Sequence, residues 1–212
     1  MMFSFKLKSY LKQKPYFSIF ITATFFQLFW LSFQGMGFHC DSPAYTEYAG
    51  FLIADRPMGI LVPVARTIGY PIIILLSGTY GFDGEFNTFI GLVLIQSLMS
   101  VLIPLILFSI LKDINLKFAL ISSFILILSL NPFIASKLVM TEQAFKFFCL
   151  LQVILALKIY RLPVWKIIGI NQSSSRIIPI FYSFLFCSIF LILIRPTALI
   201  NTLVLLSFLL VF

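Results

Sequence analysis

Long apolar segments, separated by short polar ones, run through the whole sequence. Several of them reach the roughly 20 residues that an α-helix needs to cross a bilayer core. Because a backbone inside the bilayer must satisfy its own hydrogen bonds, such segments are expected to be helices. The pattern predicts about six spans, at Pro15–Gly37, Asn87–Leu111, Phe118–Leu130, Thr141–Tyr160, Ile177–Ile194 and Thr197–Phe212. The third is short unless residues 131–135 extend it. The expected fold class is an all-α integral membrane protein, with residues 1–212 forming a single transmembrane domain.

The segment between the first two spans, residues 38–86, is long for a loop of a compact membrane protein. It contains two short pieces with helical signals. Ser42 and Pro43 are typical of the cap and first position of a helix, which predicts a short helix over Pro43–Ala54. Tyr70–Leu76 is apolar but too short to span a bilayer. Two such pieces in one outer loop predict short helices that lie along the membrane surface.

Composition supports a membrane protein and sets its orientation. Of the 212 residues, 61% are hydrophobic, and the mean hydropathy is +1.09, which excludes an ordinary soluble domain. The net charge is +8, but no basic patch interleaved with aromatic residues indicates nucleic-acid binding. Basic residues concentrate on one side of the predicted spans, which places the N-terminus in the cytoplasm, with the bacterial inner (plasma) membrane as the expected location. The cytoplasmic set is Lys6, Lys8, Lys12, Lys14, Lys112, Lys117, Lys158, Arg161, Lys166 and Arg176, and the outer set is Arg56, Arg66, Lys137 and Arg195.

Six of the seven acids fall on the outer side in this topology, all but Asp113. Acids gathered at one membrane edge indicate a working site, because charge near lipid is costly. The leading candidate is Asp41, in the polar stretch Phe38–Tyr48, although an ordinary loop acid or a helix cap would also fit. His39 and Cys40 beside it lack the usual geometry of metal ligands.

The outer cations and a second acid also have structural alternatives. Arg66 and Lys137 could simply flank the membrane, and Arg195 could extend along apolar surface to the interface. Glu142 suits the first turn of a helix. It also stands four residues before Lys146, which is the favourable order for a helical ion pair. Both readings of each residue stay open from the sequence.

Several short motifs follow one another along the chain, namely Asp41-Ser42-Pro43-Ala44-Tyr45, Ala49, Arg66-Thr67-Ile68-Gly69-Tyr70-Pro71, Asn131-Pro132, Met140-Thr141-Glu142 and Arg195-Pro196. Their order resembles that of the GT-C glycosyltransferases. The groups most similar to it are the aminoarabinose transferases, the protein O-mannosyltransferases and the bacterial RgtA/B/C/D-like proteins. They cover only the N-terminal half of a usual family member. Since the last span ends at Phe212 without a polar cap, the chain is expected to be the truncated N-terminal half of a GT-C fold.

The resemblance implies a transferase that moves a hexosyl or pentosyl group from a polyprenyl-phosphate donor to a lipid, glycan or protein acceptor. The transfer takes place at the outer (periplasmic or luminal) face of the membrane. Asp41 then matches the family's acidic residue, which acts as the base or helps to hold a metal. Ser42 stands where many relatives carry a second acid, so the need for a divalent cation stays open and no cofactor is assigned. The donor phosphate would contact Arg66, Arg195 and Lys137.

Two further residues complete the candidate substrate site. Glu142 would orient the acceptor or Lys146. Tyr45 is either an interfacial aromatic residue or a surface on which a sugar ring stacks. The other partner that the sequence implies is the membrane lipid itself.

Two other functions fit the same sequence. A transporter or flippase for a lipid-linked or polar solute would carry polar or broken sites at the middle of its spans. Here the mid-span residues are almost wholly apolar and the ionisable groups crowd the outer edge, which favours chemistry at the interface. The second alternative is a non-catalytic, truncated remnant.

Overall fold

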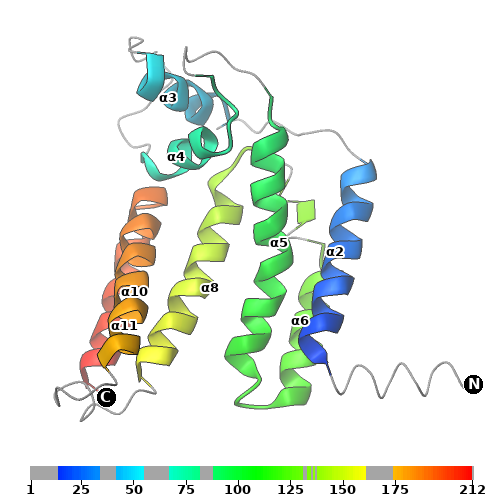
Figure 1. Ribbon diagram of the computed structural model, residues 1–212, viewed down its shortest axis with the longest axis vertical. Coiled ribbons are helices and arrows are strands. Elements are labelled where there is room, and N and C mark those ends of the chain that lie inside the picture. The colour runs from blue at the N-terminus through cyan, green and yellow to red at the C-terminus, as the bar shows by residue number, and fades with distance from the viewer. Residues whose placement is uncertain are drawn as a thin grey trace, which may run out of the picture.

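The chain forms a bundle of α-helices, as a computed structural model shows (Figure 1). The structure describes residues 14–33, 42–54, 67–81, 88–130, 133, 134, 136, 138–160 and 174–211. Within these ranges there are helices and no β-strand. The helices are α2 (Pro15–Phe33), α3 (Ser42–Ala54), α4 (Gly69–Leu76), α5 (Ile90–Leu111), α6 (Leu116–Leu128), α8 (Thr141–Tyr160), α10 (Ser174–Ile194) and α11 (Ala198–Val211).

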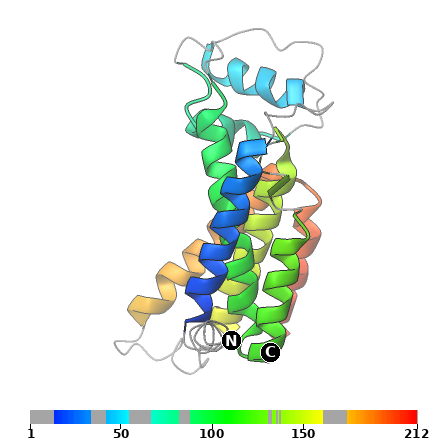
Figure 2. The same ribbon diagram turned by 90° about the vertical axis from the view of Figure 1, so that its right-hand side faces the viewer.

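The two short helices between α2 and α5, namely α3 and α4, lie across one end of the bundle. Helices α3 and α4 pack against each other there, and α4 also contacts α10 (Figures 1 and 2). We call this the upper end. The other six helices run along the long axis, with α5 between α2, α6 and α8, and with α8 against α10 and α11. Helix α2 begins and α11 ends at the lower end.

Three of these helices are long and apolar enough to cross a membrane, at Pro15–Ser32, Ile90–Leu111 and Thr141–Tyr160. Shorter apolar stretches are found in α6, α10 and α11. The outward surface is apolar as well, since Leu28, Leu94 and Phe186 are each 62% exposed. So large an exposed apolar surface is typical of a lipid-facing one. The expectation of an all-helical fold is confirmed, and three of the described helices could span a membrane.

The third predicted span is a short helix. Helix α6 has 13 residues and is therefore about 20 Å long, less than the roughly 30 Å of a bilayer core. It begins at a clear cap, because the Asn115 side chain accepts hydrogen bonds from the backbone N–H groups of Lys117 and Phe118 at 2.9 and 3.0 Å. It does not continue past Leu128, since Leu130 adopts a left-handed backbone conformation with φ 58°. Helix α6 thus ends at Leu128, and residues 131, 132 and 135 of the expected extension lie outside the described residues.

Prolines inside the apolar helices do not end them. Helix α5 runs unbroken through Pro104, and α10 runs through Pro179. The Pro104 carbonyl also accepts a hydrogen bond from Ser123 of α6 at 3.2 Å, which ties the two helices together.

The interior is more polar than the sequence pattern indicated. Four glutamines are at most 3% exposed, namely Gln27, Gln96, Gln143 and Gln152. Gln152 of α8 donates to Ser188 of α10 at 2.9 Å and to Thr202 of α11 at 3.0 Å, so one amide joins three helices. The expectation of almost wholly apolar mid-span residues missed these bonds, because a lone glutamine hardly lowers the hydropathy of a 20-residue segment.

Candidate functional site

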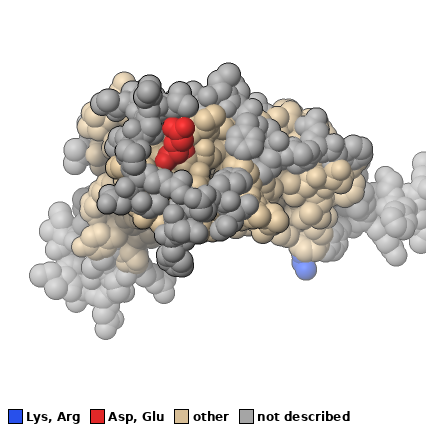
Figure 3. All heavy atoms as spheres, turned by 90° about the horizontal axis from the view of Figure 1, so that it is seen from above, with Lys and Arg blue, Asp and Glu red and all other residues tan. Residues whose placement is uncertain are grey.

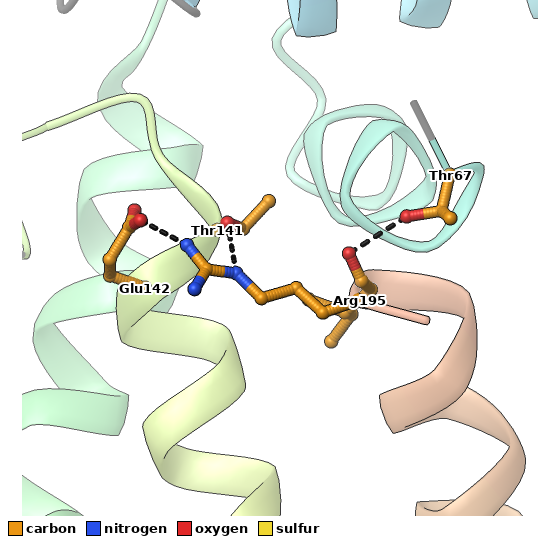
Figure 4. Close-up of polar contacts among 5 residues, drawn as sticks. Thr67, Thr141, Glu142 and Arg195 are labelled. Carbon is orange, nitrogen blue, oxygen red and sulfur yellow. Dashed lines mark hydrogen bonds and ion pairs between the residues drawn. The ribbon is translucent and has the colours of Figure 1, made fainter. Parts of the chain in front are cut away.

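The described ion pair at the upper end of the bundle joins Arg195, just after α10, to Glu142, in the first turn of α8 (Figure 4). The Arg195 Nη2 atom donates to Glu142 Oε1, and Nε donates to Thr141 Oγ1 at 3.1 Å. The guanidinium carbon also lies 5.3 Å from the centre of the Phe145 ring, within cation–π range. Three successive contacts from α8 therefore fix one cation at the end of a neighbouring helix.

The pair is partly open to its surroundings. The Arg195 side chain is 38% exposed and the Glu142 side chain 33%. Guanidinium has five N–H donors, and the bonds to Glu142 and Thr141 use two of them. On the acid, Oε2 is buried and has no hydrogen-bond partner among the described residues. The arrangement can therefore accept a further polar group, and an exposed guanidinium edge matches the geometry of a phosphate.

Helix α4 holds the chain at Arg195 from above. The Thr67 hydroxyl, two residues before α4, donates to the carbonyl of Ile194 at 2.7 Å (Figure 4). Gly69 is the first residue of α4 and packs against the backbone of Leu193 and Ile194. A Cβ built on Gly69 would lie 2.6 Å from the Leu193 carbonyl and 2.7 Å from the Ile194 nitrogen. Only glycine allows so close an approach, so the Thr67–Gly69 segment fits onto the end of α10.

Below this contact a buried tyrosine links α4 to the bundle. Tyr70 is fully buried, and its hydroxyl accepts a hydrogen bond from Gln96 Nε2 of α5 at 2.6 Å. Burial raises the pKa of Tyr70 above its ordinary value of 10.0, and the nearby Glu142 charge raises it further. Tyr70 is therefore a neutral hydrogen-bonding group that ties the candidate site to α5.

Helix α3 is attached at the same place. Its Ser42 side chain is buried and donates to the Val139 carbonyl at 2.9 Å, two residues before Thr141. Tyr45, one turn further, is 7% exposed and stands edge-on to Tyr70, with ring centres 5.1 Å apart. The predicted short helix over residues 43–54 is confirmed. Tyr45 is thus packed inside the fold. The sequence had offered two exposed positions for this ring, at the membrane interface or as a sugar-stacking surface, and the buried position matches neither.

Viewed from above, one small acidic area is visible among the described residues of the upper surface (Figure 3). Glu47 of α3 is exposed, on a solvated face of the helix. Among the residues that the structure describes, no group of three histidine, cysteine, aspartate or glutamate side chains converges on a metal-binding geometry. The described part of the site is therefore one of hydrogen bonds and a single ion pair.

The structure brings together two of the six residues nominated from the sequence, Glu142 and Arg195. Their direct pairing was not predicted; for Glu142 the sequence offered a helical ion pair with Lys146 as one alternative and a site role as the other. Asp41, Arg66 and Lys137 lie outside the described residues. In the chain, however, Asp41 immediately precedes Ser42 and Arg66 immediately precedes Thr67, and both of these residues are hydrogen-bonded to the site.

Sequence reasoning overlooked several residues that build the site. Thr67, Gly69 and Tyr70 lie within the Arg66–Pro71 string that carried the family resemblance, yet only its arginine was given a role. Gln96 is the one amide side chain of the apolar helix α5. A polar residue in such a segment is a signal in itself, because it must find a partner when it is buried.

Comparisons of the chain with protein-family models, with curated proteins and with solved structures find no significant match. The class that the described residues define is therefore that of an all-helical protein with three helices able to span a membrane. Its candidate site lies where α4, α8 and α10 meet.

Proposed function

We propose that the chain is a membrane glycosyltransferase that moves a sugar from a polyprenyl-phosphate donor to an acceptor hydroxyl at the upper end of the bundle. The observation that carries this proposal is the fixed, partly exposed Arg195 guanidinium. The order of motifs along the chain, which resembles that of the GT-C glycosyltransferases, gives it a reaction class.

In the proposed reaction the bond between the anomeric carbon and the donor phosphate breaks, and a bond from that carbon to the acceptor oxygen forms. The acceptor proton passes to the Asp41 carboxylate, which acts as general base. The negative charge that develops on the departing phosphate is stabilised by Arg195, with Arg66 and Lys137 as further cations. Glu142 positions Arg195 until the phosphate arrives.

The proposal includes a topology. Six spans, formed by α2, α5, α6, α8, α10 and α11, would place the upper end at the outer membrane face, where α3 and α4 lie along the surface. An isoprenoid tail keeps the donor in the bilayer, so its phosphate lies at the interface. The charged groups at the ends of α8 and α10 would contact such a phosphate.

The test is transfer of labelled sugar from polyprenyl-phosphate donors in membranes that contain the full chain. We expect wild-type transfer, strong loss with Asp41→Asn, and loss with Arg195→Gln. Glu47→Gln, on the exposed face of α3, is the matched control for a nearby acid and should transfer like wild type. A folded wild type that is inactive with every donor would contradict the enzyme proposal. Unchanged transfer by Asp41→Asn would remove only the assigned base.

Transport of a lipid-linked or polar solute is the second candidate, because the buried glutamines supply polar groups inside the bundle. Each amide, however, donates to a side chain of a neighbouring element, for example Gln143 to Ser100 at 2.8 Å. Bonds of this kind hold membrane helices together. Uptake of a labelled lipid-linked sugar into sealed vesicles without chemical change would favour the transport function.

A further inference from the structure

A second polar site lies at the lower end of the bundle, at the opposite end from Arg195. It is a cavity of about 230 Å³ between α2, α5 and α8. Its polar wall is made by Tyr16, Ser109, Lys112, Asp113 and Lys158. Since a water molecule occupies about 30 Å³ in the liquid, the cavity has room for a phosphate group and part of its ester.

The charges of this cavity favour an anion. Two lysines face one aspartate, which leaves a formal charge of +1. Each lysine sits at the end of a helix, Lys112 as the C-cap of α5 and Lys158 in the last turn of α8. Helix dipoles favour a cation at each of these places separately. They do not account for the convergence of both on one cavity.

The cavity wall is also organised by specific contacts. The Lys112 ammonium lies 5.3 Å from the centre of the Tyr16 ring. Tyr16 is fixed in turn by an edge-to-face contact with Phe108 at 4.8 Å and by a hydrogen bond with Ser109 at 3.0 Å. That bond uses one of the two hydroxyl hydrogens. Whichever hydroxyl accepts in this bond keeps its own hydrogen, which it can donate to a further acceptor.

Part of the cavity wall is apolar. Ile154 and Leu157 of α8 form it, on the same helix as Lys158. A cavity that combines cations, a hydroxyl donor and aliphatic side chains suits a phosphate ester with an alkyl portion better than a free inorganic anion. Basic pockets between membrane helices are a general feature of sites for anionic lipid headgroups.

We propose that this cavity binds the phosphate group of an anionic membrane phospholipid, held by Lys112, Lys158 and the Tyr16–Ser109 hydroxyl pair. The proposal needs the bundle to sit in a membrane, but it does not depend on the glycosyltransferase function. In the predicted topology the cavity faces the cytoplasmic leaflet. A lipid bound there would join α2, α5 and α8 at the end where no surface helix covers them in the described part of the chain.

The test is the thermal unfolding midpoint of the full chain in detergent, titrated with phosphatidylglycerol, phosphatidylcholine or inorganic phosphate. We expect phosphatidylglycerol alone to raise the midpoint. The phosphatidylglycerol concentration that gives half of this shift should increase with added salt. The double variant Lys112→Gln/Lys158→Gln should weaken this response about 25-fold, at roughly fivefold per lysine. Lys117→Gln is the matched control, because this exposed lysine lies on α6 at the same end and does not line the cavity.

A gain-of-binding variant separates the proposal from simple loss of folding. Asp113→Asn raises the formal charge of the cavity to +2 and should tighten phosphatidylglycerol binding several-fold. An equal response to phosphatidylcholine, or equal weakening by Lys117→Gln, would overturn the proposal. So would weaker lipid binding by a folded Asp113→Asn variant. A full response to inorganic phosphate at the same concentration would assign the cavity to free phosphate and refute the lipid.

Discussion

The contact between α4 and the end of α10 makes a sharp prediction for Gly69→Ala. The substitution adds one methyl group and changes no charge. Its carbon would lie 2.6 Å from the Leu193 carbonyl, whereas carbon atoms pack at about 3.5 Å. The atoms it meets belong to the backbone and cannot rotate away. Helix α4 must therefore move from α10 by about 1 Å.

Such a movement also breaks a hydrogen bond. The Thr67–Ile194 contact of 2.7 Å would open to about 3.6 Å, beyond hydrogen-bonding distance. Overpacking costs about 1–3 kcal/mol, and a lost hydrogen bond adds about 1 kcal/mol. The sum is about 2–4 kcal/mol, which corresponds to a drop in Tm of about 4–16 °C for a chain of this size.

The assay is thermal unfolding of purified Gly69→Ala in detergent micelles, compared with Gly78→Ala. Gly78 follows the same helix and has φ +69°, but a Cβ there would meet nothing within 4 Å. The Gly78→Ala variant should therefore lose only the free energy of placing alanine in a left-handed backbone conformation, about 1 kcal/mol. Gly69→Ala should have the lower Tm of the two. Equal midpoints, or a lower one for Gly78→Ala, would refute the close approach of α4 and α10.

Three further predictions follow from single contacts. Arg195→Lys keeps the charge but loses the planar donor pair, so kcat/KM for transfer from a polyprenyl-phosphate donor should fall about tenfold. The change in Tm should correspond to less than about 1 kcal/mol. Equal loss of transfer in Arg195→Lys and Arg195→Gln would contradict a phosphate-binding role in which the positive charge alone retains part of the activity. Tyr70→Phe leaves the buried Gln96 amide without its acceptor and should cost about 1–3 kcal/mol in thermal unfolding. Because burial raises the pKa of Tyr70 above 10.0, the folded state favours the neutral phenol. This stabilisation is complete below pH 10 and is lost as the pH rises above it, so wild type should lose stability more steeply there than Tyr70→Phe. Gln152→Leu removes the bonds from α8 to α10 and α11 and should cost about 1 kcal/mol; a higher Tm in this variant would mean that the amide does not hold the helices together.

The helices that hydropathy predicts best are those with strong local signals. Helix α8, expected at Thr141–Tyr160, has those bounds in the structure. The short α3 was also predicted, because Ser42-Pro43 is a local start signal. The length of α6 was not fixed by hydropathy, since the backbone at Leu130 turns left-handed in a run that remains apolar.

The candidate site was harder to predict because its contacts join residues far apart in the chain. Arg195 and Glu142 were each nominated, one as a phosphate ligand and one as an acid in a first helical turn. Nothing local pairs residues 53 positions apart, whereas the alternative that the sequence offered for Glu142, an ion pair with Lys146, follows from helical spacing alone. The roles of Thr67 and Gly69 depend on where α10 ends relative to α4, and that is decided by packing.

The weakness of the Arg195–Glu142 pair is consistent with a binding role. Both side chains are about one-third exposed, and ion pairs with this much solvent contribute only about 0.2–1 kcal/mol. A phosphate, with more charge and more acceptor atoms than a carboxylate, could replace Glu142 at little cost. The contacts that hold the arginine in place do not depend on that acid, because Thr141, Phe145 and the Thr67–Ile194 bond remain. The cation would thus stay positioned while its counter-ion is exchanged, which is the behaviour that a phosphate-binding site requires.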